Sequence, residues 1–117
     1  MRRIKSFIHA FNGIKMAFKE EPNFKIHVVA TIMVIAAGLY FQLSTEEWLA
    51  VIIVIGLVLL TELLNTAIEN IADFISPERH EKIKTIKDIS AAAVLISAIV
   101  ALVVGLLIFI PKILLIL

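Results

Sequence analysis

Residues 89–110 read ISAAAVLISAIVALVVGLLIFI, and this stretch decides the fold. Only Ser90, Ser97 and Gly105 interrupt an otherwise hydrophobic run. About 20 helical residues, each rising 1.5 Å, cross the roughly 30 Å hydrocarbon layer of a bilayer. An uncharged run of this length is longer than the buried helices of soluble proteins, so it predicts a transmembrane helix.

Two earlier apolar stretches, Val28–Phe41 and Trp48–Leu60, extend the same pattern. The first reaches spanning length if it begins near Pro22, because proline suits the first turn of a helix. The 117-residue chain is 61% hydrophobic, whereas soluble domains are about 45–50% apolar. We therefore predict an all-α integral membrane protein, one domain over residues 1–117, with transmembrane helices over 22–43, 46–75 and 88–110.

Residues 4–19 show a different pattern, in which apolar side chains recur every three or four positions. These side chains are Ile4, Phe7, Ile8, Phe11, Ile14 and Phe18, with basic and polar residues between them. This spacing is typical of an amphipathic helix with a basic polar face, lying in the membrane interface. The alternative is a helix that packs on a soluble partner.

The distribution of Lys and Arg predicts the orientation. Six basic residues precede the first span, four lie between the second and third, and the loop 43–47 has none. Only Lys112 falls at the other side. Because basic loops stay in the cytoplasm, we expect a multi-pass protein of the cytoplasmic membrane, with its N-terminus inside and its C-terminus outside.

The second span carries polar residues that are rare in membrane helices. At 100° per residue they share one sector of about 100° on the helix, and they are Glu62, Asn65, Thr66, Glu69 and Asp73. A carboxylate at a helix centre costs roughly 2.5–3.5 kcal/mol on insertion scales. Such residues usually serve a function, although single polar side chains also join neighbouring helices.

Several carboxylates near Lys87 suit a hard cation such as Mg²⁺, which takes oxygen ligands and is often shared with nucleotide phosphates. Phosphoryl transfer needs this ion, a cation for the phosphates and an acceptor for the attacking hydroxyl. No Gly-rich phosphate loop is present, and the absence of cysteine excludes thiolate chemistry. A lipid phosphotransferase, a cation- or proton-coupled transporter and an inactive scaffold all stay open. A transporter, however, needs its acidic groups near the midplane.

The stretch from Glu62 to Glu69, ELLNTAIE, resembles the prokaryotic diacylglycerol kinase family, which includes the undecaprenol kinases. Asp73, His80, the pair Lys87-Asp88 and the alanine-rich 91–94 extend the similarity over nearly the whole chain. Thr85-Ile86 stands where the family pattern has small residues. The resemblance implies an ATP- and Mg²⁺-dependent lipid kinase that works as a homotrimer, with active sites between subunits and no nucleic-acid partner.

The same resemblance implies roles for individual residues. Glu62 matches the general base that takes the proton of the lipid hydroxyl, and Asn65 lies beside it in the lipid-binding site. Glu21 and Glu69 match the Mg²⁺ ligands. The residues expected to contact ATP and its metal are Arg2, His9, Glu21, Glu69, Glu78, Arg79, His80, Lys87 and Asp88.

The lipid substrate has two candidates. The run Asn23-Phe24-Lys25-Ile26-His27 is similar to undecaprenol kinases of Gram-positive bacteria, which favours undecaprenol. Diacylglycerol is the alternative, with phosphatidic acid as the product. Both lipids present a primary alcohol at the interface, so the catalytic residues do not separate them.

Overall fold

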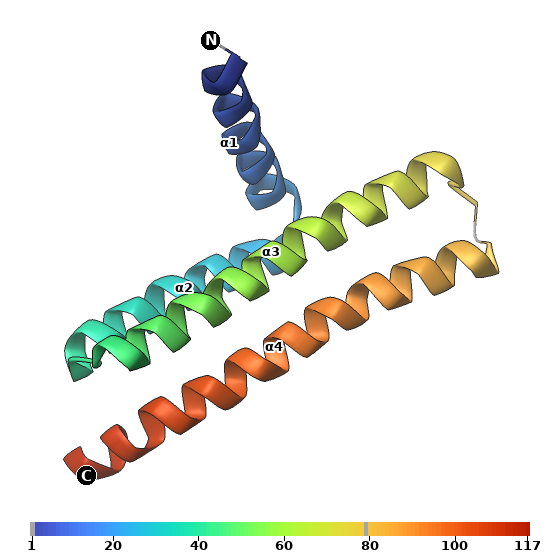
Figure 1. The fold of residues 1–117 in the computed structure, drawn as a ribbon. Coiled ribbons are helices and arrows are strands. Elements are labelled where there is room, and N and C mark those ends of the chain that lie inside the picture. The colour runs from blue at the N-terminus through green and yellow to red at the C-terminus, as the bar shows by residue number, and fades with distance from the viewer. Residues whose placement is uncertain (1, 79) are drawn as a thin grey trace.

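The computed structural model describes residues 2–78 and 80–117, which contain four helices and no strand. The helices are α1 (Arg2–Glu20), α2 (Pro22–Phe41), α3 (Thr45–Ile75) and α4 (Glu81–Ile116), as Figure 1 shows. Three of them, α2, α3 and α4, are long and apolar enough to cross a membrane. The predicted all-α class, with three spanning helices after an N-terminal helix, is confirmed.

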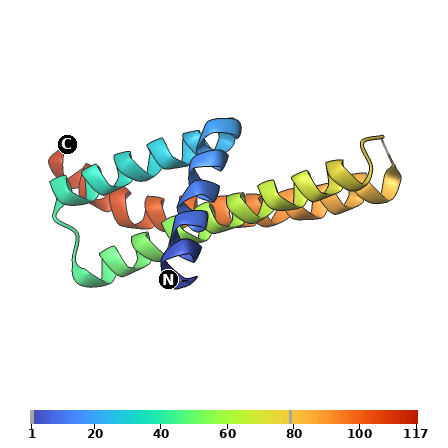
Figure 2. The same cartoon turned by 90° about the horizontal axis from the view of Figure 1, so that it is seen from above.

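The three long helices form an antiparallel bundle from which α1 projects. In Figures 1 and 2, α3 and α4 lie side by side along their length, whereas α2 accompanies only the first part of α3. At about 1.5 Å per residue, α2 is about 30 Å long and α3 about 46 Å. The joined ends of α3 and α4 therefore extend beyond the start of α2. We call this part the α3–α4 end.

Capping residues explain where the helices begin and stop. Gln42 adopts a left-handed backbone with φ 54°, which ends α2 at Phe41, two residues before the expected 43. Ser44 and Glu47 form a reciprocal capping box, with nitrogen–oxygen distances of 2.9 and 3.2 Å, so α3 begins at Thr45. His80 Nδ1 accepts a hydrogen bond from the Lys82 amide at 3.1 Å. This cap starts α4 at Glu81, before the apolar run from which position 88 was predicted.

Two buried serines join α4 to α3. Ser90 Oγ donates to Asn65 Oδ1 at 2.7 Å, and Ser97 Oγ lies 2.8 Å from Thr61 Oγ1. The serines are two helical turns apart, so both lie on the same face of α4. Small side chains let membrane helices approach closely, and hydroxyl groups hydrogen-bond across the contact. This contact sets the position of α4 along α3.

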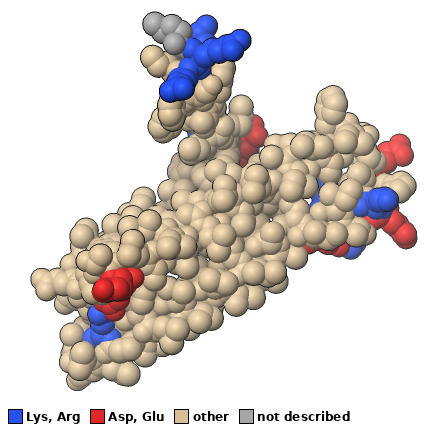
Figure 3. Space-filling model, viewed as in Figure 1, with Lys and Arg blue, Asp and Glu red and all other residues tan. Residues whose placement is uncertain are grey.

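Aliphatic side chains cover the outside of the bundle. Leu39, Ile53, Ile89, Ile96 and Leu107 are each more than 60% exposed. Figure 3 shows charged residues at the two ends of the bundle, at the tip of α1 and near its base, while the long face of the bundle between its two ends is mostly uncharged. A long apolar belt between charged ends matches the surface of a membrane protein, whose outer side chains contact lipid.

An ion pair lies at the end opposite to the α3–α4 end. Lys112 Nζ of α4 is 3.1 Å from Glu47 Oε2 at the start of α3. Glu47 thereby both caps its own helix and contacts α4. The pair closes the bundle at this end, close to Trp48.

Gly38 provides a test of the packing between α2 and α3. A Cβ atom at this position would lie 2.6 Å from Trp48 Cη2 and 3.1 Å from Leu43 Cδ1. Because the indole ring is rigid, we expect Gly38→Ala to destabilise the protein by about 1–3 kcal/mol. The measurement is the midpoint of thermal unfolding in detergent micelles.

Gly56→Ala is the matched control. A Cβ at Gly56 meets nothing within 4 Å, and alanine is the better helix former. We expect this variant to unfold at or slightly above the temperature of the parent. Equal midpoints for the two glycine variants would contradict the packing seen around Trp48.

Candidate active site at the α3–α4 end

Glu62 is the most buried charged group of the site. It lies in the second half of α3 and is only 4% exposed. Its Oε1 is 3.1 Å from Nε2 of His27, which comes from α2. A carboxylate buried in an apolar bundle is costly unless a donor compensates it. The bundle therefore holds this carboxyl group between two helices rather than exposing it on the outer surface.

Asn65 connects α3 to α4 and to a second acid. Its Nδ2 donates to Glu69 Oε1 at 3.2 Å, and its Oδ1 accepts from Ser90 at 2.7 Å. Both ends of the amide are thus fixed, which orients the Glu69 carboxylate one turn further along the same face of α3. The structure brings Glu62, Asn65 and Glu69 to one side of the helix, as their spacing predicts.

Glu21 adds a carboxylate from the junction between α1 and α2. Burial raises the pKa of the Glu21 carboxyl above its ordinary value. Repulsion by neighbouring carboxylates adds to this rise of the pKa, in the order Glu69, Glu62 and Glu20. Acids close enough to repel one another form a region of negative potential that favours a cation. We call Glu21, Glu62, Asn65 and Glu69 the acidic cluster.

The oxygen donors of this cluster fit Mg²⁺. The ion is usually bound by one or two carboxylates, together with waters and substrate phosphates. Residues 2–78 and 80–117 contain no group of three or more His, Cys, Asp or Glu arranged to hold a metal. Two carboxylates, such as those of Glu21 and Glu69, would nevertheless be enough for an ion that a nucleotide shares.

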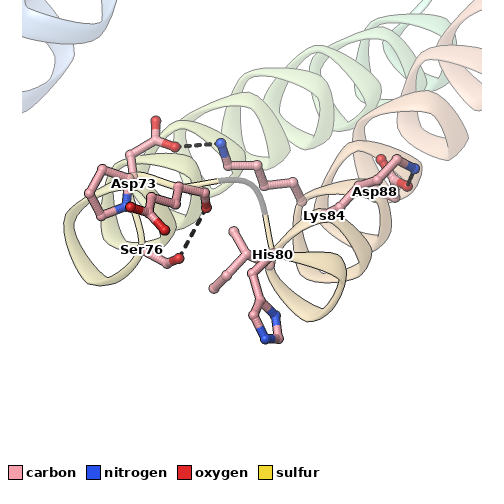
Figure 4. Close-up of a pocket in the computed structure, with 9 residues that line it drawn as sticks. Asp73, Ser76, His80, Lys84 and Asp88 are labelled. Atoms are coloured by element: carbon pink, nitrogen blue, oxygen red, sulfur yellow. Dashed lines mark hydrogen bonds and ion pairs between the residues drawn. The ribbon is translucent and has the colours of Figure 1, made fainter.

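A charged hollow lies beyond the acidic cluster, between the end of α3 and the start of α4. Its volume is about 270 Å³. Lys87 is bonded to Asp73, and Lys84 Nζ lies 2.8 Å from Asp88 Oδ2. Figure 4 shows these groups around the connection between the two helices. The lining residues are Asp73, Ser76, Pro77, Glu78, His80, Ile83, Lys84, Lys87 and Asp88.

This hollow gathers four of the residues expected to contact a nucleotide, namely Glu78, His80, Lys87 and Asp88. The other expected contacts lie elsewhere. Arg2 and His9 are exposed on α1, which projects from the bundle, and neither lines the hollow. Arg79 lies outside the described residues. Ile86 contributes to a separate apolar hollow against α3, so it packs away from the charged residues.

Sequence reasoning missed three contacts of the site. His27 pairs with Glu62, Ser90 binds Asn65, and Asp73 binds Lys87. Ser90 and Asp73 had a visible signal, because serine is rare in the last apolar run and Asp73 shares the polar sector of α3. His27 had none, because α2 is apolar on every side and its sequence does not show which face meets α3.

The clusters lie at different depths along α3. Glu62 is about 26 Å from Thr45 and Asp73 about 42 Å, at roughly 1.5 Å per residue. The hydrocarbon core of a bilayer is about 30 Å thick. If the core begins near Thr45, Glu62 lies just inside its far boundary and the charged hollow lies outside it.

The fold and the site define a class: a small multi-pass membrane protein with an acidic cluster around the buried Glu62 and a charged hollow between α3 and α4. Residues 8–109 match the prokaryotic diacylglycerol kinase family. The chain belongs to this family, and the family predicted from ELLNTAIE is therefore confirmed.

Curated relatives support the assignment along most of the chain. The chain is 41% identical to the undecaprenol kinase of Bacillus subtilis (strain 168), covering 95% of this chain and 90% of the relative. It is 36% identical to a diacylglycerol kinase of Synechocystis, covering 93% and 63%. It is 32% identical to the diacylglycerol kinase of Escherichia coli (strain K12), covering 87% and 84%. The predicted enzyme class, a lipid kinase, is confirmed, and the transporter and scaffold alternatives are set aside.

Proposed function

We propose that this protein transfers the γ-phosphoryl group of ATP to the primary alcohol of undecaprenol, with Mg²⁺, at the cytoplasmic face of the membrane. The similarity to an undecaprenol kinase supports the lipid, and the run 23–27 agrees with it. The observation that carries the proposal is the buried Glu62, which lies close to further carboxylates. Diacylglycerol is the second candidate, because two of the relatives are diacylglycerol kinases.

The proposed reaction uses Glu62 as the general base. Its carboxylate accepts the proton of the lipid hydroxyl, and the lipid oxygen forms a bond to the γ-phosphorus. The bond between that phosphorus and the bridging oxygen breaks, and ADP leaves. Asn65, fixed at both ends of its amide, holds the orientation of the site beside the base.

Glu21 and Glu69 are the proposed ligands of Mg²⁺. When bound, the ion neutralises charge on the phosphate oxygens. Glu69 keeps its orientation through the hydrogen bond from Asn65 at 3.2 Å. The raised pKa of Glu21 agrees with this role, because a bound cation would relieve the repulsion between Glu21 and Glu69.

The charged hollow is the proposed site of the ATP phosphates. Lys87 exchanges its bond to Asp73 for one to phosphate, and the start of α4 adds the positive end of a helix dipole. Glu78, His80 and Asp88 line the same hollow. Arg2, His9 and Arg79 complete the nucleotide site in a proposed homotrimer, in which α1 reaches a neighbouring subunit.

The proposed orientation follows the positive-inside rule. The α3–α4 end and α1 face the cytoplasm, where ATP is available, and the end with the Glu47–Lys112 pair faces outside. This arrangement gives a protein of the cytoplasmic membrane with its N-terminus inside and its C-terminus outside. Cysteine-labelling from each side of intact cells, at positions 5 and 115, tests it.

Side-by-side rates decide between the two lipids. Purified protein in detergent micelles receives labelled ATP, Mg²⁺ and either undecaprenol or diacylglycerol. We expect label in both, with the higher kcat/KM for undecaprenol. A higher value for diacylglycerol would reverse the order of the two candidates. Folded protein that labels neither lipid would contradict the proposed function.

Lys87 provides a test of the nucleotide site. We expect Lys87→Met to raise the apparent KM for ATP by about 10- to 100-fold, because a hydrogen bond to a charged group contributes about 1.5–3 kcal/mol. The ammonium acts on phosphate as a point charge, which methionine lacks. Lipid phosphorylation at varied ATP concentration measures the change.

Lys82→Met is the control for this variant. Lys82 is exposed in the first turn of α4, and its side chain does not line the hollow. The two variants lose the same charge from the same helix. If both raise the KM for ATP equally, the effect comes from net charge and not from a contact of Lys87 with phosphate.

A further inference from the structure

The Glu62 carboxylate depends on one side chain of another helix. Within residues 2–78 and 80–117, the side chain recorded in contact with it is His27, at 3.1 Å between Nε2 and Oε1. Thr66 donates to the backbone carbonyl oxygen of Glu62 and not to its carboxylate. His27 is partly exposed, with 27% of its side chain accessible, whereas the Glu62 side chain is 5% accessible.

At least one neighbouring acid acts against Glu62. Glu21, from the junction before α2, and Glu62 repel each other. Glu69, on α3 itself, is held by Asn65, whose other end is bonded to Ser90 of α4. Two of the three lysines at the start of α4, Lys87 and Lys84, are bonded to Asp73 and Asp88. His27 is therefore the group that holds the Glu62 side chain against repulsion from its neighbours.

We infer that His27 is a positioning residue for Glu62. In this role Nε2 lies against one carboxylate oxygen, at 3.1 Å from Oε1, and the second oxygen is left to accept the proton of the lipid alcohol. The imidazole does not contact the reacting atoms in this scheme, because it acts through the carboxylate. The inference rests on the proposed function, in which Glu62 is the base.

If His27 had only a structural role, its replacement would have a different effect on the kinetics. If the bond only joined α2 to α3, its loss would reduce stability and would affect all kinetic constants through the amount of folded protein. A positioning role reduces kcat in folded protein and leaves the KM for ATP unchanged, because the hydrogen bond acts on the chemical step alone.

His27→Gln and His27→Asn separate the two roles with matched polarity. The amide nitrogen of glutamine reaches nearly the position of Nε2, whereas that of asparagine falls short of it. Small displacements of a catalytic group can cost about 100-fold in rate. We expect the asparagine variant to lose about 10- to 100-fold in kcat, and the glutamine variant to stay within about threefold of the parent. Thr31→Val, one turn away on the same helix, is the control and should match the parent.

A double-mutant cycle with Glu62→Gln tests the coupling between the two residues. If His27 acts through the Glu62 carboxylate, adding His27→Asn to Glu62→Gln changes the residual rate by less than about twofold. All variants are compared at equal amounts of folded protein, in micelles with labelled ATP, Mg²⁺ and undecaprenol.

Two results would overturn the inference while the parent is active. One is an asparagine variant as fast as the glutamine variant. The other is that His27→Asn lowers the rate of lipid phosphorylation by the same factor in the Glu62→Gln variant as in the parent. Absence of lipid phosphorylation by the folded parent would overturn the proposed function, and this inference with it.

Discussion

Replacing Glu62 by glutamine is expected to lower the rate of lipid phosphorylation by about 10²–10⁴-fold, the usual effect of losing a positioned base. The affinity for Mg²⁺-ATP should stay unchanged, because the charged hollow lies further along the helices. An amide has nearly the shape of a carboxylate but does not accept the proton. The measurement is a pair: the rate with undecaprenol, and nucleotide binding in the same micelles.

The stability of the Glu62→Gln variant is informative as well. Removing a buried charge from a membrane helix should not lower the unfolding temperature, and the amide keeps nearly the same shape beside His27. Glu46→Gln is the matched control, an exposed glutamate in the first turn of the same helix. Retained activity would remove Glu62 from the mechanism. Loss of both activity and nucleotide affinity would instead assign it to the metal site.

Replacing Glu69 or Glu21 by glutamine is expected to raise the Mg²⁺ concentration for half-maximal rate by about tenfold or more. A neutral amide oxygen binds a hard cation less well than a carboxylate. Glutamine at position 69 still accepts the hydrogen bond of Asn65, so the geometry is kept while the charge is lost. Rates at saturating ATP and varied Mg²⁺ measure the effect.

Glu20→Gln is the control for these two variants. Glu20 lies next to Glu21 and also contributes to the raised pKa of Glu21, but it is exposed at the end of α1. Its loss should leave the Mg²⁺ requirement close to that of the parent. If the requirement is unchanged in both the Glu69 and the Glu21 variants, neither residue is a ligand of the metal.

Hydropathy was enough to predict the fold, because each spanning helix must satisfy its own backbone in lipid and needs a long apolar run. The ends of the helices were less predictable from the sequence. Helix α4 begins seven residues before the predicted start at position 88. The segment Glu81–Lys87 is polar, and it is nevertheless helical because His80 caps it. Such a cap depends on a side-chain rotamer, which a hydropathy pattern does not contain.

The site was predictable where its residues share a helix. Glu62, Asn65 and Glu69 recur at helical spacing, so one face of α3 brings them together. Contacts between helices were not predictable, as His27 illustrates, because the rotation of α2 about its axis is set by packing. Arg2 and His9 remain predictions, since α1 projects away from the described site within one chain. Under the proposed homotrimer, their roles depend on a neighbouring subunit.

Ser90 and Ser97 prevent α4 from sliding along α3. A shift of one turn, about 5.4 Å, would leave both buried hydroxyls without their present partners. Glu62 on α3 and Lys87 on α4 therefore keep a constant separation along the membrane normal. Under the proposed function, α3 and α4 together fix the depth in the membrane at which a lipid hydroxyl can react. An alcohol reacts when its hydroxyl rests at the level of Glu62, so the enzyme selects a lipid by the height of its head group before it selects by its tail.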